Sequence, residues 1–217
     1  MIFISLVQPR AFVVCRLNEL CSFLKDFIVV ADTRDIPQID LAFAFSAAAV
    51  DAEDSFDKMK DTLDAIIKQY GTDQIRYAVI TFGSTSSVIV NFGDDSGKDA
   101  LRTIVKQLSR PAGDPDIKNV LKRAESLFEN ASPSPGTRKI LVIFIDKKST
   151  NSRIDIKEAA KPLIDKNVTI VPAAVGSEVD VDEIELLPPN KNYIAVCPIP
   201  EPETWPDKII DKALKGK

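Results

Sequence analysis

The stretch Lys139-Ile140-Leu141-Val142-Ile143-Phe144-Ile145-Asp146 decides the fold of this 217-residue chain. Every residue from Ile140 to Ile145 is apolar, so a strand formed there has no polar face that could be exposed to solvent. A strand with one wet face would alternate apolar and polar residues instead. A short run that is apolar throughout indicates the centre of a parallel sheet that is covered by helices on both faces.

Apolar runs of strand length alternate along the chain with segments whose apolar residues recur at helical spacing. The further strands are predicted at 39–45, 75–82, 87–92, 168–175 and 192–196. The helices are predicted around 56–70, 101–108, 117–128, 156–164, 181–187 and 205–214. The second and third of these strands are close enough to form a hairpin. The sequence therefore predicts an α/β fold: a Rossmann-like, doubly wound, mostly parallel six-stranded sheet, with one antiparallel edge strand and helices on both faces.

The regular pattern begins near residue 38, which predicts a domain over 38–217 and an N-terminal extension over 1–37. The apolar start of the extension is short, and charged residues recur through the rest of it from Arg10 onward. No run approaches the roughly 20 apolar residues that a membrane span needs. Three interpretations of the extension stay open: a poor signal peptide, a remnant of a longer chain, or a helix that docks on the domain.

Composition excludes several classes of function. Basic residues number 28 and acidic residues 32, and the two signs are interleaved, which argues against nucleic acid as a partner. The chain has no histidine, so the nucleophile systems and zinc sites that depend on imidazole are absent. No glycine-rich nucleotide-binding motif is present either. We therefore expect neither an enzyme nor a cofactor.

The three cysteines are Cys15, Cys21 and Cys197, and none forms a CxxC pair. Cys21 and Cys197 flank the predicted domain, so a disulfide between its ends is one interpretation. Buried or incidental thiols are the other. Asn130 and Asn167 begin glycosylation triplets, which matter if the chain is secreted. Pro133 follows the first triplet and should weaken its use.

Ligands of parallel α/β sheets bind at the carboxyl ends of the strands. Three loops are expected at that edge: the loop after Phe45, the loop around 111–116, and the loop after Ile145. The first of these is chemically sparse, because it reads Ser46-Ala47-Ala48-Ala49-Val50.

Several of these segments, in this order, resemble the von Willebrand factor type A domain family. They are Asp40 to Phe45 with the small-residue loop after it, Ile75 to Gly83, Lys139 to Asp146, and Thr169 to Gly176. The resemblance covers Gln38 to Leu214. It implies a domain that commonly binds Mg²⁺ at the top of its sheet and coordinates an acidic group of a protein partner through it.

In the resembled family the metal ligands come from Asp-x-Ser-x-Ser after the first strand, a Thr in the second loop, and an Asp after the fourth strand. The first motif falls on Ser46, Ala48 and Val50, which together offer one neutral hydroxyl. Asp114 stands about where the Thr would be, and Asp146 matches the last aspartate. Mg²⁺ requires nearly octahedral oxygen coordination, so we expect a degenerate site without a metal.

Two of these acidic positions also have a purely structural interpretation. Asp114 as N-cap, Pro115 as first helical residue and Asp116 in the first turn would make an ordinary helix start. Lys147 and the lysine after it would partly neutralise Asp146. Weak cation binding remains an alternative if Asp114, Asp116 and Asp146 converge.

The resemblance and the sparse first loop together favour a non-enzymatic module of an adhesion or extracellular-matrix type. It would bind a protein ligand, on a matrix or a cell surface, without Mg²⁺, and it would be secreted rather than cytoplasmic. The alternative is an intracellular scaffold domain of the same fold in a multiprotein complex. A Rossmann-like enzyme is the least favoured interpretation.

Overall fold

The computed structural model describes residues 13–14, 38–49, 52–73, 75–94, 97–188 and 195–197. Its strands are β1 (Val13–Val14), β2 (Ile39–Phe45), β3 (Ile75–Phe82), β4 (Ser86–Val90), β5 (Arg138–Lys147), β6 (Val168–Glu178) and β7 (Ala195–Cys197). Its helices are α2 (Ala52–Tyr70), α3 (Lys98–Lys106), α4 (Ile117–Asn130), α5 (Arg153–Asp165) and α6 (Val181–Ile184). None of these helices combines the length and the apolarity that crossing a bilayer requires.

One sheet joins all the described strands, in the order β1-β7-β6-β5-β2-β3-β4. Every neighbouring pair is parallel except β3 and β4, which form the predicted antiparallel hairpin at one edge. The predicted number of six strands is wrong, because the described residues form seven. The additional strand is β1, two residues inside the N-terminal extension, whose backbone pairs with Ala195 and Val196 of β7. A strand this short has no periodicity for sequence reasoning to detect.

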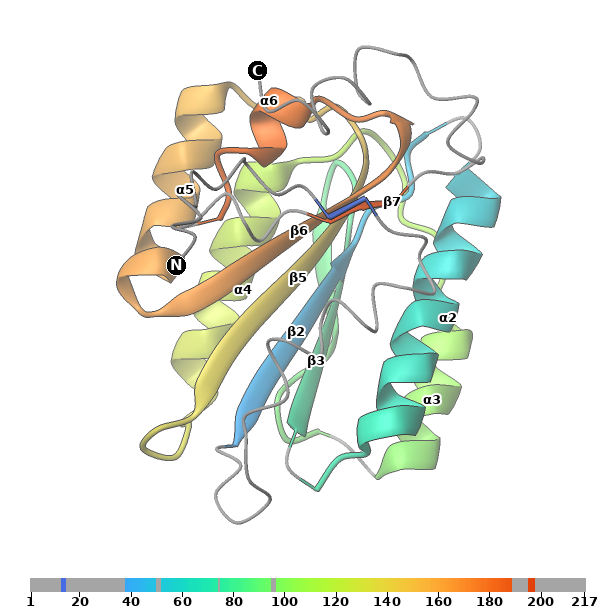
Figure 1. The fold of residues 1–217 in the computed structure, drawn as a ribbon, viewed down its shortest axis with the longest axis vertical. Helices are drawn as coiled ribbons and strands as arrows, with labels where there is room; N and C mark the ends of the chain where they lie inside the picture. Colours follow the sequence, from blue (N-terminus) through green and yellow to red (C-terminus); the bar gives the residue numbers. More distant parts are fainter. Residues whose placement is uncertain are drawn as a thin grey trace, which may run out of the picture.

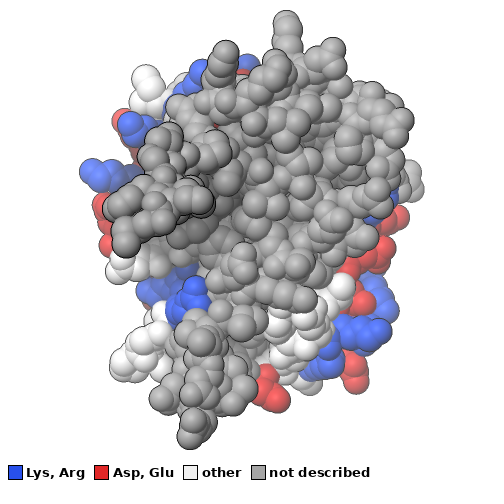
Figure 2. All heavy atoms as spheres, viewed as in Figure 1, with Lys and Arg blue, Asp and Glu red and all other residues white. Residues whose placement is uncertain are grey.

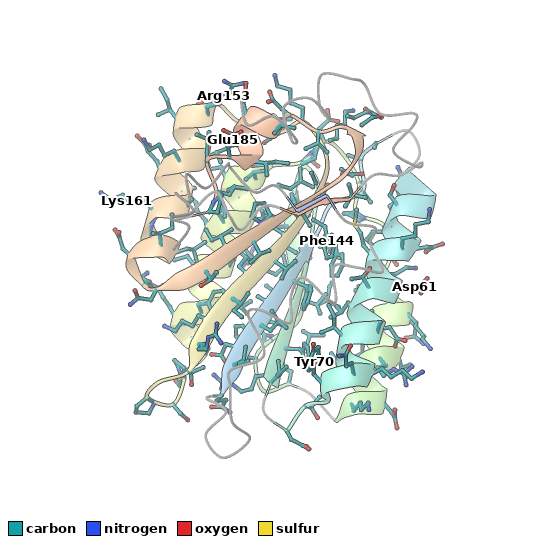
Figure 3. The ribbon with its side chains drawn as sticks, viewed as in Figure 1. Asp61, Tyr70, Phe144, Arg153, Lys161 and Glu185 are labelled. Atoms are coloured by element: carbon teal, nitrogen blue, oxygen red, sulfur yellow. The ribbon has the colours of Figure 1, made fainter. Side chains whose placement is uncertain are left out.

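Helices cover both faces of the sheet (Figure 1). One apolar layer joins alternate strand residues to α2 and α3, and a second joins the intervening strand residues to α4 and α5. Phe144 of β5 projects into the first layer (Figure 3), where its ring stacks on that of Phe45 at a centroid distance of 5.1 Å. The two layers explain why the central strands are apolar throughout: side chains on both faces are buried.

Element bounds follow the sequence prediction closely in the centre of the chain and less closely at its margins. α2 begins at Ala52, four residues before the first apolar residue of the predicted helix. β6 continues past Gly176 to Glu178, where it pairs with Lys147 after an irregularity in the register. The predicted helix at 205–214 lies outside the described residues.

Charged side chains are interleaved on the described part of the visible surface (Figure 2). Many form local pairs, such as Arg102 with Asp64 at 2.8 Å between Nε and Oδ1. One pair has a buried carboxylate: Asp40 of β2 is fully buried and accepts Nε–H and Nη2–H of the half-buried Arg76 at 2.7 and 2.8 Å. This pair lies near the amino ends of the strands, at the opposite end of the sheet from the loops after β2 and β5.

Candidate binding face at the carboxyl ends of the strands

Three loops meet at the carboxyl ends of the parallel strands, as the sequence predicted. They follow β2, lie between α3 and α4, and follow β5, at the end of the sheet where α2 and α5 begin (upper end in Figure 1). The described part of the first loop ends at Ala49, so Val50 lies outside the described residues.

Asp146 is the centre of the contacts between the first and third loops. Its side chain is fully buried. One carboxylate oxygen accepts a hydrogen bond from the hydroxyl of Ser46. The other accepts the backbone N–H groups of Ala48 at 2.6 Å and Ala49 at 2.9 Å. Both oxygens of the carboxylate are therefore engaged by the first loop.

This arrangement opposes the one a cation needs. A bound cation requires oxygen atoms directed toward it, whereas the backbone of Ala48 and Ala49 directs N–H groups at the carboxylate. N–H and hydroxyl donors are the partners that stabilise a buried negative charge without a cation. Among the positions Ser46, Ala48 and Asp146, the donor set does not fit Mg²⁺.

Two carbonyl groups of the first loop point away from Asp146 and toward Arg110. The Nε of Arg110 donates to the carbonyl oxygen of Ala47 at 2.8 Å, and the Nη2 of Arg110 donates to that of Ala49 at 3.3 Å. Arg110 therefore joins the second loop to the first. Sequence reasoning missed this residue, and its only signal was a basic side chain directly before the loop predicted at 111–116.

The acidic residues of the second loop have separate local roles. Asp114 pairs with Lys147, whose Nζ lies 2.9 Å from Oδ1, and this hydrogen bond raises the pKa of Lys147. Asp116 caps α4 by accepting the N–H of Asn119 at 2.8 Å. The prediction of Asp114 as N-cap is wrong: the cap is Asp116, and Pro115 lies outside the helix.

Pro115 stays outside the helix because its carbonyl serves the third loop. That oxygen accepts the N–H of Thr150 at 3.1 Å and the hydroxyl of Ser149 at 3.1 Å. A helix starting at Pro115 would commit the carbonyl of Pro115 to an intrahelical bond instead.

The weak cation candidates Asp114, Asp116 and Asp146 are not brought together. One forms an ion pair, one caps a helix, and one is buried under the first loop. Within the part of the chain that the structure describes, no group of three or more His, Cys, Asp or Glu side chains is placed to hold a metal ion. The two lysines expected to neutralise Asp146 pair with other carboxylates, Lys147 with Asp114 and Lys148 with Asp180.

The third loop is anchored by a buried carboxylate that sequence reasoning also missed. Glu183 of α6 is 2% exposed and accepts the N–H of Ser149 at 2.9 Å. Burial raises the pKa of Glu183 above its usual value of 4.5. Asn151, which hydrogen-bonds Ser149, also accepts the N–H of Lys118 at 2.8 Å. These contacts fix the loop after β5 against the start of α4.

The turn between β3 and β4 forms backbone hydrogen bonds with the second loop. The N–H of Ser84 donates to Ala112 at 3.1 Å, and the N–H of Asp116 donates to Gly83 at 2.9 Å. A side chain at Gly83 would place its Cβ only 2.1 Å from the carbonyl oxygen of Ala112. The close approach of the two backbones therefore requires glycine at position 83.

Two surface hollows flank Arg110. The first, of about 310 Å³, is lined by Ala47, Ala48, Arg110, Pro111, Ala112, Gly113 and Asp114. The second, of about 360 Å³, is lined by Phe56, Asp57, Lys60, Leu108 and Arg110. The first hollow therefore offers mainly backbone groups and small side chains, and the exposed guanidinium of Arg110 lies between the two hollows.

The two predicted glycosylation positions lie away from this face. Asn130 is the last residue of α4, and Asn167 is exposed in the turn between α5 and β6 with φ 58°. Cys197 ends β7, and Cys21 lies outside the described residues, so the predicted disulfide stays a prediction.

The von Willebrand factor type A domain model matches residues 40–197. The collagen alpha-5(VI) chain of Mus musculus is 25% identical over 175 residues, which cover 76% of this chain and 7% of the collagen chain. The collagen alpha-6(VI) chain of Mus musculus is 23% identical over 158 residues, which cover 70% of this chain and 7% of that collagen. The chain therefore spans only a small part of the length of these relatives.

Solved structures share the fold. Proximal thread matrix protein 1 from the mussel byssus, with a zinc-occupied MIDAS motif, matches with a TM-score of 0.65 and 20% identity, covering 82% of this chain and 45% of that chain. Manganese-loaded TRAP protein of Plasmodium vivax matches with a TM-score of 0.62 and 16% identity, covering 74% of this chain and 68% of that chain. With a family model that matches more than half of its length, the chain belongs to the von Willebrand factor type A domain family.

Proposed function

We propose that this domain is a non-enzymatic protein-binding module of the adhesion or extracellular-matrix class, and that it engages its partner without a divalent cation. One observation carries the cation part: the carboxylate of Asp146 is fully buried, and the hydroxyl and N–H donors of the first loop occupy both of its oxygens. Recognition then depends on the shape and charge of the three loops.

The chemistry of the donors supports cation independence. Mg²⁺ dehydrates reluctantly and keeps an octahedral shell of oxygen ligands. To supply that shell, the first loop would have to release Asp146 and turn two N–H groups away from it. Releasing a buried carboxylate from its donors is unfavourable by an amount comparable to several hydrogen bonds.

The matrix assignment rests on relatives. The collagen VI chains and the byssus protein are matrix proteins by name, and they share sequence or fold with most of this chain. Secretion and a protein ligand are what such a role requires. The absence of histidine from the sequence supports a binding role rather than catalysis.

Isothermal titration of the chain with MgCl₂ and with MnCl₂ tests the cation part. We expect no saturable heat. A saturable site of micromolar affinity in the wild type that is absent in Asp146→Ala would overturn it. Asp57→Ala is the matched control, because it removes an exposed carboxylate at the second hollow and leaves Asp146 unchanged.

Surface plasmon resonance on immobilised collagens I and VI, fibronectin and laminin tests the binding part. We expect saturable binding to at least one of them, with the same Kd in EDTA and in MgCl₂. Loss of binding in EDTA would contradict cation independence. Absence of binding to every one of them would contradict the matrix assignment.

A further inference from the structure

We propose that Arg110 is the receptor for a carboxylate side chain of the protein partner, which its guanidinium binds directly. This inference deepens the proposed function and rests on it, since it names the chemical group that the domain recognises. Arg110 is exposed and lies between the two hollows at the carboxyl ends of the strands.

The guanidinium of Arg110 is oriented, and no carboxylate of the described residues neutralises it. Two of its five N–H donors bind the carbonyl oxygens of Ala47 and Ala49, which carry no charge. The other three donors have no partner in the described part of the chain, so they are open to a ligand. Within the described residues no ion pair involves Arg110, whereas Arg76, Arg102 and Arg153 each contact a carboxylate.

Orientation by the backbone makes this arginine a prepared site. A free arginine side chain loses rotamer freedom when it binds a ligand, and that loss offsets part of the attraction. Here the contacts to Ala47 and Ala49 have already fixed the plane of the guanidinium. A planar fork of N–H donors matches the two oxygens of a carboxylate, and such charge-assisted pairs are stronger than neutral hydrogen bonds.

The surroundings of Arg110 leave its guanidinium open to a carboxylate. The first hollow presents Ala112 and Gly113, which leave the approach to the guanidinium open. Its one acidic residue, Asp114, is already paired with Lys147. In the second hollow Asp57 is likewise paired, with Lys60 at 2.7 Å. The apolar residues of that hollow, Phe56 and Leu108, are only 3% and 7% exposed, so the guanidinium is the group that a partner can reach.

The probe is the blocked peptide Ac-Gly-Gly-Glu-Gly-Gly-NH₂, whose one charged group is the Glu side chain. It is titrated into the ¹⁵N-labelled full chain and followed by ¹H–¹⁵N NMR. We expect saturable shifts of the Arg110 Nε–H signal and of the amides of Ala47 to Ala49. The shifts should shrink as NaCl is raised, because a charge pair near the surface is screened. The Gln analogue of the peptide should leave these signals in place.

Arg110→Gln should weaken peptide binding about tenfold or more, which is the effect of losing a charge-assisted bidentate pair. Arg110→Lys keeps the charge but loses the planar fork, and we expect an intermediate Kd. The matched control is Arg123→Gln, which removes an exposed charge from α4 and should bind as the wild type does. The spectra of the variants also report whether the first loop keeps its fold.

Three results would overturn the proposal: equal binding by Arg110→Gln with its fold intact, equal shifts with the Gln peptide, or shifts only with a phosphoserine peptide. The phosphoserine result would assign the site to phosphate instead. The proposed function fails separately. Matrix binding retained by Arg110→Gln would reject the carboxylate receptor alone, whereas peptide binding without any matrix binding would reject the matrix assignment alone.

Discussion

The hydroxyl of Ser46 donates a hydrogen bond to the carboxylate of Asp146 across the carboxyl ends of β2 and β5, one hundred residues apart in the chain. Ser46 also accepts the backbone N–H of Asp146 at 3.4 Å. Both residues are fully buried. Ser46 therefore has a structural part in this domain: it satisfies a buried charge that the first loop encloses.

Ser46→Ala should lower the free energy of unfolding by about 1–3 kcal/mol, because it leaves one oxygen of a buried carboxylate without its donor. Urea denaturation followed by circular dichroism measures the change. Ser126→Ala, at an exposed serine of α4, is the control and should stay within about 0.5 kcal/mol of the wild type. Equal stability of the Ser46 and Ser126 variants would mean that the Ser46 contact contributes nothing.

The fold was accessible from sequence because its signals are local and strong. The apolar runs at β2, β3, β5 and β6 indicated a parallel sheet, and the structure confirms that architecture. Strand number was not accessible, since β1 is two residues long and depends on pairing with β7. Such a strand is determined by its tertiary partner and not by its own pattern.

The site was only partly accessible. The sequence indicated which loops meet and that the first loop has few oxygens, and the structure brings Ser46 and Asp146 together as the shared edge of the sheet requires. It did not indicate that the N–H groups of Ala48 and Ala49 turn toward Asp146, nor that Arg110 takes the opposite carbonyls. The direction of N–H and carbonyl groups in a loop of small residues cannot be predicted from the chemistry of its side chains.

Arg76→Met should destabilise the domain by about 3–5 kcal/mol, because it leaves Asp40 buried without its partner. The double variant Asp40→Leu/Arg76→Met should recover most of that loss, since an apolar pair of similar size needs no charge partner. Urea denaturation of the wild type, both single variants and the double variant completes the cycle. A double variant no more stable than Arg76→Met would show that packing of Arg76, and not the buried charge, is responsible.

Gly83→Ala should displace the second loop, because the new Cβ would lie 2.1 Å from the carbonyl oxygen of Ala112. We expect ¹H–¹⁵N NMR to show amide shifts across 110–116, together with a lower melting temperature. Gly136→Ala is the control: its positive φ of 84° gives it a backbone strain that Gly83 does not have, but its Cβ would meet nothing within 4 Å. Unchanged amides across 110–116 in Gly83→Ala would mean that the turn yields instead of the loop.

Burial of Glu183 predicts a specific dependence of stability on pH. The raised pKa means that the folded state holds a proton on Glu183 at pH values where the unfolded state has lost it. As pH rises from the usual glutamate pKa of 4.5 through the folded pKa, Glu183 therefore contributes progressively less stability, and below that window its contribution is complete. Glu183→Gln has no such proton and keeps an oxygen for the N–H of Ser149.

The difference in unfolding free energy between Glu183→Gln and the wild type should therefore move in favour of the variant as pH rises from about 4 to about 7. Taking the difference removes the effects of carboxylates that both proteins share. Asp64 is one of them: the hydrogen bond from Arg102 lowers its pKa, so its contribution to stability increases as pH rises, opposite to that of Glu183. Urea denaturation at matched ionic strength across this range measures it. A difference that is constant with pH would show that Glu183 titrates alike in the folded and unfolded chains.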